Sequence, residues 1–151
     1  MIEYLTVEDL LRLVEDLDVG PVRDLGLLEA AAHRPTTSLW GREAYPALEE
    51  KAAALLESVV GTHPLVDGNK RLGWLATVVF LDLNGRWLDA PDDEVYDLVV
   101  AVASGTADLH EIASALRREL DQESFTVPAG RTMAPNVFTV EFSDDDFPRA
   151  Q

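Results

Sequence analysis

The sequence predicts an all-α fold, an irregular bundle of helices around one central apolar helix. Apolar residues recur at three- and four-residue spacing along most of residues 1–120, and the run 72–83 is apolar on nearly every side. A chain of 151 residues, 47% of them hydrophobic, is long enough for one compact domain. We therefore expect one helical domain over residues 1–120, followed by an extension, residues 121–151, of different composition.

Capping and breaking residues predict where the helices begin and end. Thr6 and Asp9 have the spacing of a capping box, and Asp108 and Glu111 repeat it. Gly61 is expected to end the helix that precedes the central one. The expected helices span residues 7–17, 24–33, 47–60, 72–83 (with a start near Asn69), 91–103 and 108–120.

The extension has a possible β character. Its apolar residues alternate with polar neighbours, as they do in a strand. These residues are Phe125, Val127, Phe138, Val140 and Phe142. We expect a solvated tail or a strand-mediated dimer contact; the alternative is an anionic lid in which Asp144–Asp146 cover a basic site.

The composition excludes several classes of protein. Twenty-eight acidic against twelve basic residues leave a net charge of −16, which argues against sequence-independent nucleic-acid binding and against a polybasic membrane-surface protein. The absence of cysteine excludes a disulfide scaffold, a thiolate metal site and a cysteine nucleophile. The longest apolar run, about twelve residues, is shorter than the roughly twenty that span a membrane. With no signal-peptide pattern at the start, we expect a cytoplasmic protein without nucleic-acid or membrane partners.

One segment, residues 63–71, concentrates reactive side chains between two apolar helices; it reads HPLVDGNKR. If the central helix begins near Asn69, its first N–H groups form an anion site, to which Lys70 and Arg71 add charge. Basic residues at a helix N-terminus oppose the helix dipole by roughly 0.3–1 kcal/mol each, so a bound anion is expected to compensate them. The alternative is an ordinary turn with surface charge.

The remaining polar residues of the segment extend this chemistry. The imidazole of His63 is suited to accept a proton near neutral pH, and Asp67 offers an oxygen ligand to a phosphate-bound Mg²⁺. Gly68 allows a ligand to approach the backbone closely. Residue chemistry therefore indicates a base beside a phosphate site, and hence transfer of a phosphate-containing group.

The segment resembles the motif of the Fic/Doc family, His-x-Phe-x-(Asp/Glu)-(Gly/Ala)-Asn-(Gly/Lys)-Arg, and within that family the Doc (death-on-curing) toxin branch. It departs at Leu65, where the family usually has Phe; we expect Leu65 to pack the motif loop against the core less completely. The resemblance covers roughly residues 3–120 and implies a Fic-type helical bundle. It includes LLEAA at 27–31, WGREAYPALEEKAAALL at 40–56 and VVFLDLNG at 78–85.

The resemblance implies an enzyme that uses ATP and Mg²⁺ to modify a hydroxyl of a protein. Carried over by position, His63 would be the general base and Asp67 would hold Mg²⁺. The implied nucleotide- and phosphate-binding residues, which act through backbone, amide and cationic groups, are Gly68, Asn69, Lys70 and Arg71.

Three hypotheses on activity follow from the resemblance. Doc-like members carry Lys at the eighth motif position, as Lys70 does here, and this favours a kinase-like toxin that phosphorylates elongation factor Tu and arrests translation. Members that transfer AMP usually have Gly there, so an AMP transferase is the alternative. A catalytically inactive Fic-fold binding module is the third, favoured by Leu65 and the extension.

The resemblance also implies partners. Residues 36–45 read as an exposed loop or short hairpin, where relatives dock the target segment as an added strand. Trp40 and Tyr45 are the candidate target contacts there; the alternative is that they anchor the loop on the core. The sequence has no Ser or Thr four residues before a Glu, as an internal inhibitory helix of the family would, so we expect restraint by a Phd-like antitoxin.

Overall fold

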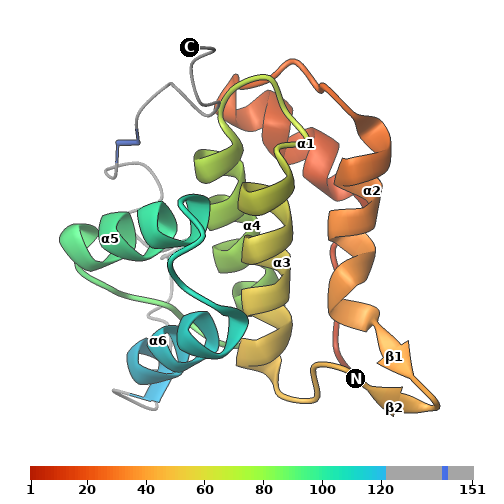
Figure 1. The fold of residues 1–151 in the computed structure, drawn as a ribbon, viewed down its shortest axis with the longest axis vertical. Coiled ribbons are helices and arrows are strands. Elements are labelled where there is room, and N and C mark those ends of the chain that lie inside the picture. The colour runs from red at the N-terminus through yellow and green to blue at the C-terminus, as the bar shows by residue number, and fades with distance from the viewer. Residues whose placement is uncertain (122–140, 143–151) are drawn as a thin grey trace.

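A computed structural model, in which residues 1–121 and 141–142 are described, shows the mostly helical bundle that the sequence predicts (Figure 1). The elements in chain order are α1 (Val7–Leu17), α2 (Leu25–His33), the 3₁₀ turn η1 (Arg34–Thr36), β1 (Ser38–Leu39), β2 (Arg42–Glu43), α3 (Leu48–Thr62), α4 (Asn69–Leu83), α5 (Asp92–Ala103) and α6 (Leu109–Asp121). Helices α3 and α4 stand side by side at the centre, with α1 and α2 on one side and α5 and α6 on the other (Figure 1).

Both predicted capping boxes are present. The Thr6 hydroxyl accepts a hydrogen bond from the Asp9 N–H at 3.1 Å, and the Asp9 carboxylate accepts one from the Thr6 N–H at 2.9 Å. Asp108 and Glu111 exchange the same pair of bonds at 2.8 and 3.2 Å. The side-chain chemistry at these two positions therefore fixes the starts of α1 and α6.

The helix that precedes the motif is longer than predicted. Gly61 lies inside α3, which continues to Thr62, so the prediction that Gly61 ends this helix is wrong. A glycine costs an exposed helix about 1 kcal/mol relative to alanine. Packing outweighs that cost, because α3 contacts α2, α4, α5 and α6 and most of its residues are buried. Helix α3 therefore packs as a second, largely buried helix beside the predicted central helix, α4.

The two central helices approach closely at Gly73. A Cβ atom at this position would lie 2.5 Å from the Cγ2 of Val60, so only glycine allows α4 to pack at this distance from α3. The short connection between these helices, residues 63–68, is called the motif loop below. It lies at one end of the bundle (Figure 1).

Most of the extension lies outside the described residues. These include four residues of possible β character, Phe125, Val127, Phe138 and Val140, and Asp144–Asp146 of the alternative lid. Phe142 is described: it is buried and its ring stacks on Tyr96 of α5, with centroids 5.9 Å apart. In the described part of the chain, every helix is too short or too polar to cross a membrane.

Candidate functional site

His63 ends α3 in a strained conformation. It is the C-cap residue of that helix, with φ 53° and ψ 62°, a left-handed conformation that costs a residue other than glycine roughly 1–2 kcal/mol. Its side chain is half-buried. The Arg23 guanidinium donates to the carbonyl oxygens of His63 and Thr62, at 2.8 and 3.0 Å. The imidazole that could serve as a base is therefore attached to a fixed piece of backbone.

Asn69 holds the motif loop closed. It is fully buried; its Oδ1 accepts from the Leu65 N–H at 2.9 Å, and its Nδ2 donates to the Leu65 carbonyl at 3.0 Å. Leu65 is itself fully buried in the core at the position where the family has Phe. The resemblance implied that the Asn69 amide would help to bind an anion. In the structure this amide also bonds the Leu65 backbone and so fixes the loop that precedes α4.

Gly68 and the start of α4 have the features of an anion site. Gly68 is the N-cap residue, with φ 92°, and no side chain caps the helix. A Cβ atom on Gly68 would lie 2.4 Å from the Cβ of Val19, so no other residue fits without displacement. The first turn of α4 has no acidic residue; it contains half-buried Lys70 and exposed Arg71. The helix end and both cations therefore favour the same ligand, a phosphate.

Asp67 supplies a single carboxylate beside this helix end. It is half-buried, and its Oδ1 accepts from the Gly68 N–H at 2.9 Å. Among the described residues no group of three or more acidic or histidine side chains could enclose a metal ion. One carboxylate next to a phosphate site suits Mg²⁺, which proteins usually bind through one or two carboxylates, substrate phosphates and water. The residues present therefore fit a magnesium ion that arrives with a nucleotide.

A second segment, residues 19–24, forms a wall of the site that the sequence did not reveal. It pairs with the motif loop through the backbone bonds Gly20 N–H to Asp67 O at 3.0 Å, Val66 N–H to Pro21 O at 2.9 Å, and Arg23 N–H to Pro64 O at 2.8 Å. In the sequence these residues only follow the predicted helix 7–17. Pairing between segments more than forty residues apart has no local signal.

The predicted loop 36–45 is a hairpin, and it does not lie beside the motif. Helix α2 begins next to the motif loop and runs away from it, and the 15 residues of α3 return over about 22 Å. The hairpin therefore lies at the opposite end of the bundle (Figure 1). The structure brings together His63, Asp67, Gly68, Asn69, Lys70 and Arg71, and it does not bring Trp40 and Tyr45 to them.

Tyr45 and Trp40 have different surroundings. The Tyr45 hydroxyl accepts from the Arg34 Nε at 3.2 Å, so Tyr45 anchors the hairpin on the bundle. Buried Lys51 of α3 also donates to the Tyr45 carbonyl and to the Glu43 carboxylate. Trp40 lies at the tip of the hairpin and is fully exposed, so it does not pack on the core. Its φ of 50° is a left-handed conformation, which is unfavourable for a residue other than glycine.

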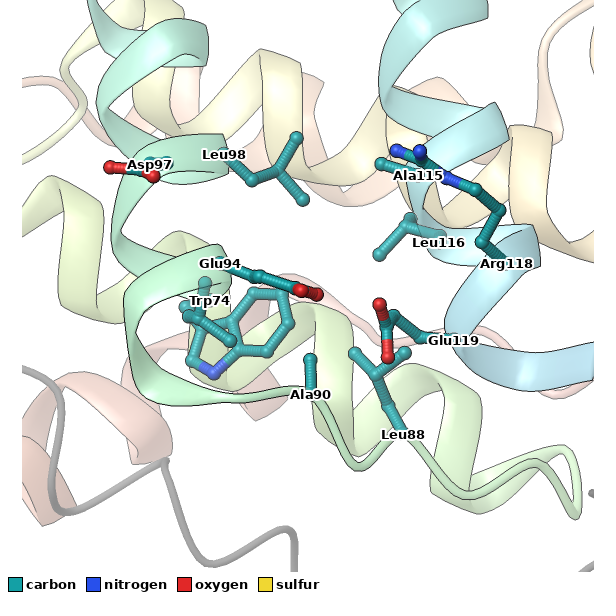
Figure 2. Close-up of a pocket in the computed structure, with 11 residues that line it drawn as sticks. Trp74, Leu88, Ala90, Glu94, Asp97, Leu98, Ala115, Leu116, Arg118 and Glu119 are labelled. Atoms are coloured by element: carbon teal, nitrogen blue, oxygen red, sulfur yellow. The ribbon is translucent and has the colours of Figure 1, made fainter. Parts of the chain in front are cut away.

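A cavity of about 530 Å³ lies elsewhere, between α5 and α6 and over Trp74 of α4 (Figure 2). None of residues 63–71 lines it. Glu94 of α5 and Glu119 of α6 are among its lining residues, and their carboxyl groups point toward one another (Figure 2). Burial, and a hydrogen bond and like charge from Glu94, raise the pKa of Glu119 above its ordinary value. Three acidic residues, Glu94, Asp97 and Glu119, line this cavity against one basic residue, Arg118, so it is a poorer candidate for a phosphate-containing ligand than the start of α4.

Comparison with known proteins agrees with this geometry. The model of the Fic/DOC family matches residues 4–81, more than half of the chain, and its match includes the whole motif loop. The chain belongs to the Fic/DOC family. It is also 47% identical over 120 residues to the protein named Toxin Doc of Mycolicibacterium smegmatis, and the match covers 77% of this chain and 92% of that protein. The model described as FhaA, N-terminal domain, matches residues 92–151, less than half of the chain. This member of the Fic/DOC family is therefore a homologue of a Doc toxin.

Proposed function

We propose that this chain is the toxin of a toxin–antitoxin pair and that it transfers a phosphoryl group from ATP to a hydroxyl of a protein. The observation that carries the proposal is the motif loop, in which His63 and the basic start of α4 lie at the same end of one helix pair. Similarity to Toxin Doc supports the toxin role, and elongation factor Tu is the expected target, so that modification would arrest translation.

The proposed step uses residues of this loop and of the first turn of α4. The His63 imidazole takes the proton of the target hydroxyl, whose oxygen attacks the γ-phosphorus of ATP; the bond to the β,γ-bridging oxygen breaks and ADP leaves. Lys70, Arg71 and the N-terminus of α4 stabilise the charge on the phosphates. Asp67 would hold Mg²⁺, which when bound would neutralise phosphate charge.

Lys70 favours phosphoryl transfer over AMP transfer. Its half-buried side chain occupies the first turn of α4, where AMP transferases of the family carry glycine and leave room for the α- and β-phosphates. AMP transfer remains the second candidate; its attack would fall on the α-phosphorus with pyrophosphate as the leaving group. The third candidate, an inactive module, has less support, because Leu65 is fully buried and the loop around it is closed.

Labelled ATP distinguishes these candidates. Purified elongation factor Tu and a bacterial lysate are each incubated with this protein, Mg²⁺ and ATP labelled at the γ- or the α-phosphate. We expect label on protein from the γ position, and none with His63→Ala. Label from the α position would show AMP transfer. Growth inhibition that survives His63→Ala, with no label from either position, would support the inactive module.

We also propose that Trp40 contacts a protein partner away from the reaction centre. Trp40 presents a fully exposed indole at the tip of the hairpin, and burial of that indole by another protein would remove apolar surface from water. Trp40→Ser should slow label transfer to the target while the Kd for ATP stays unchanged. An unchanged rate of transfer would remove Trp40 from target docking.

We propose a Phd-like antitoxin as the source of restraint, since the sequence lacks the internal inhibitory pattern of the family. Growth arrest on expression of this chain should be relieved by coexpression of the antitoxin encoded with it. Arrest that persists would contradict this part of the proposal.

A further inference from the structure

The Arg23 side chain bridges the two peptide groups on either side of the His63 Cα atom. Its Nη2 donates to the Thr62 carbonyl at 3.0 Å, and its Nε donates to the His63 carbonyl at 2.8 Å. The first carbonyl belongs to the peptide plane that sets φ of His63, and the second belongs to the plane that sets ψ. One guanidinium therefore restrains both dihedral angles of this residue.

The backbone of Arg23 is fixed against the same loop. Its N–H donates to the Pro64 carbonyl at 2.8 Å, and the next N–H, of Asp24, donates to the same oxygen at 3.1 Å. Val22 forms a β-bridge with Leu65. The Arg23 side chain is thus fixed at its backbone by the loop and at its guanidinium by the end of α3. A planar guanidinium on a fixed backbone loses less conformational entropy when it binds the helix terminus.

The contact also suits the end of α3. The last carbonyls of a helix have no partner within the helix and carry a partial negative charge, and a planar guanidinium can bond two of them at once. The α3 helix has no basic residue in its own last turn, so this charge comes from a different segment. A left-handed residue persists only where its surroundings determine it, and Arg23 provides that restraint at His63.

We propose that Arg23 is a positioning residue for the general base: it holds the His63 backbone so that the imidazole projects toward the target hydroxyl. The inference rests on the proposed function of His63. Arg23 acts through backbone carbonyls, and no contact with nucleotide or target is assigned to it.

The test uses the full chain with Arg23→Met and Arg23→Lys, and Arg117→Met as the matched control. Arg117 is also an exposed arginine, and it forms a 2.7 Å ion pair with Glu49 in the first turn of α3, at the opposite end of that helix from His63. The first readout is the backbone NMR of His63, where the ³J(HN–Hα) coupling and the Cα and Cβ shifts report a positive φ. The second is the single-turnover rate of γ-label transfer, measured beside the Kd for ATP.

We expect Arg23→Met to move the His63 resonances out of the left-handed range and to slow transfer about 10- to 100-fold, because a displacement near 1 Å can have that effect. The Kd for ATP should stay within about twofold, since α4 holds the phosphates. A lysine keeps the charge but lacks the planar, pre-organised fork of a guanidinium, so Arg23→Lys should be intermediate, and Arg117→Met should behave as the wild type.

Unchanged His63 resonances in Arg23→Met would overturn the proposal, and so would a loss of rate in Arg117→Met equal to that in Arg23→Met. Full activity of Arg23→Lys with His63 resonances outside the left-handed range would also overturn it, because the rate would then not depend on the conformation that Arg23 is proposed to fix. If the wild-type protein transfers no label, the proposed function fails, but the NMR measurement still decides whether Arg23 fixes His63.

Discussion

Replacing Gly68 with alanine should destabilise the protein more than a glycine substitution usually does. Gly68 has φ 92°, so alanine adopts a strained backbone there, at roughly 1–2 kcal/mol. The new Cβ would also lie 2.4 Å from the Cβ and 2.6 Å from the Cγ1 of Val19. Overpacking of this kind costs typically 1–3 kcal/mol, because a Cβ atom cannot rotate away. We expect the free energy of unfolding to fall by about 2–5 kcal/mol.

Urea denaturation measures this loss, and two further variants show its cause. Gly61→Ala is the control: Gly61 lies in α3 with nothing within 4 Å of the added Cβ, so it should raise the free energy of unfolding by about 0.5–1 kcal/mol. Because the closest atom to the new methyl group is the Val19 Cβ, Val19→Ala should recover little of the Gly68→Ala loss and Val19→Gly more of it. A loss below about 1 kcal/mol for Gly68→Ala would refute the argument from close approach.

Three further predictions concern other polar contacts. Asn69→Asp keeps the acceptor for the Leu65 N–H but replaces the donor with an oxygen that faces the Leu65 carbonyl. Urea denaturation should therefore show a fall of about 1–3 kcal/mol in the free energy of unfolding, and an unchanged midpoint would refute this reasoning. Lys51→Met should speed amide exchange in the hairpin at least tenfold without an equal change in α4, because Lys51 holds Tyr45 and Glu43; equal exchange would contradict the anchor. The raised pKa of Glu119 means that the folded state binds a proton more tightly than the unfolded state, so stability falls as the pH rises through that pKa. Glu119→Gln should therefore raise Tm near pH 8 and have less effect near pH 4, and a Tm difference independent of pH would exclude this cause.

Local chemistry made part of the fold predictable. The Thr6 and Asp108 boxes, the hairpin after η1 and the start of α4 at Asn69 each depend on residues within a few positions of one another. The end of α3 did not follow, because burial of its faces outweighs the propensity of Gly61.

Long-range packing decided what the sequence could not show. The contacts of Arg23 with His63 join residues forty positions apart, and no periodicity marks them. The position of Trp40 depends on the direction in which α2 and α3 run. The hairpin and the motif can therefore both be predicted from the sequence, but their positions at opposite ends of the bundle cannot. The hydrogen bonds of the buried Asn69 amide to the Leu65 backbone likewise have no signature in the sequence.

Calorimetric titration of Mg²⁺-ATP into the full chain tests the central claim most directly, that the start of α4 binds the nucleotide phosphates. The wild type, His63→Ala and Arg117→Met should bind ATP with similar Kd, and the double variant Lys70→Met, Arg71→Met should bind it at least tenfold more weakly, by the loss of about 1.4 kcal/mol or more. Equal affinity of the double variant and the wild type, or no uptake of ATP by the wild type, would contradict the claim.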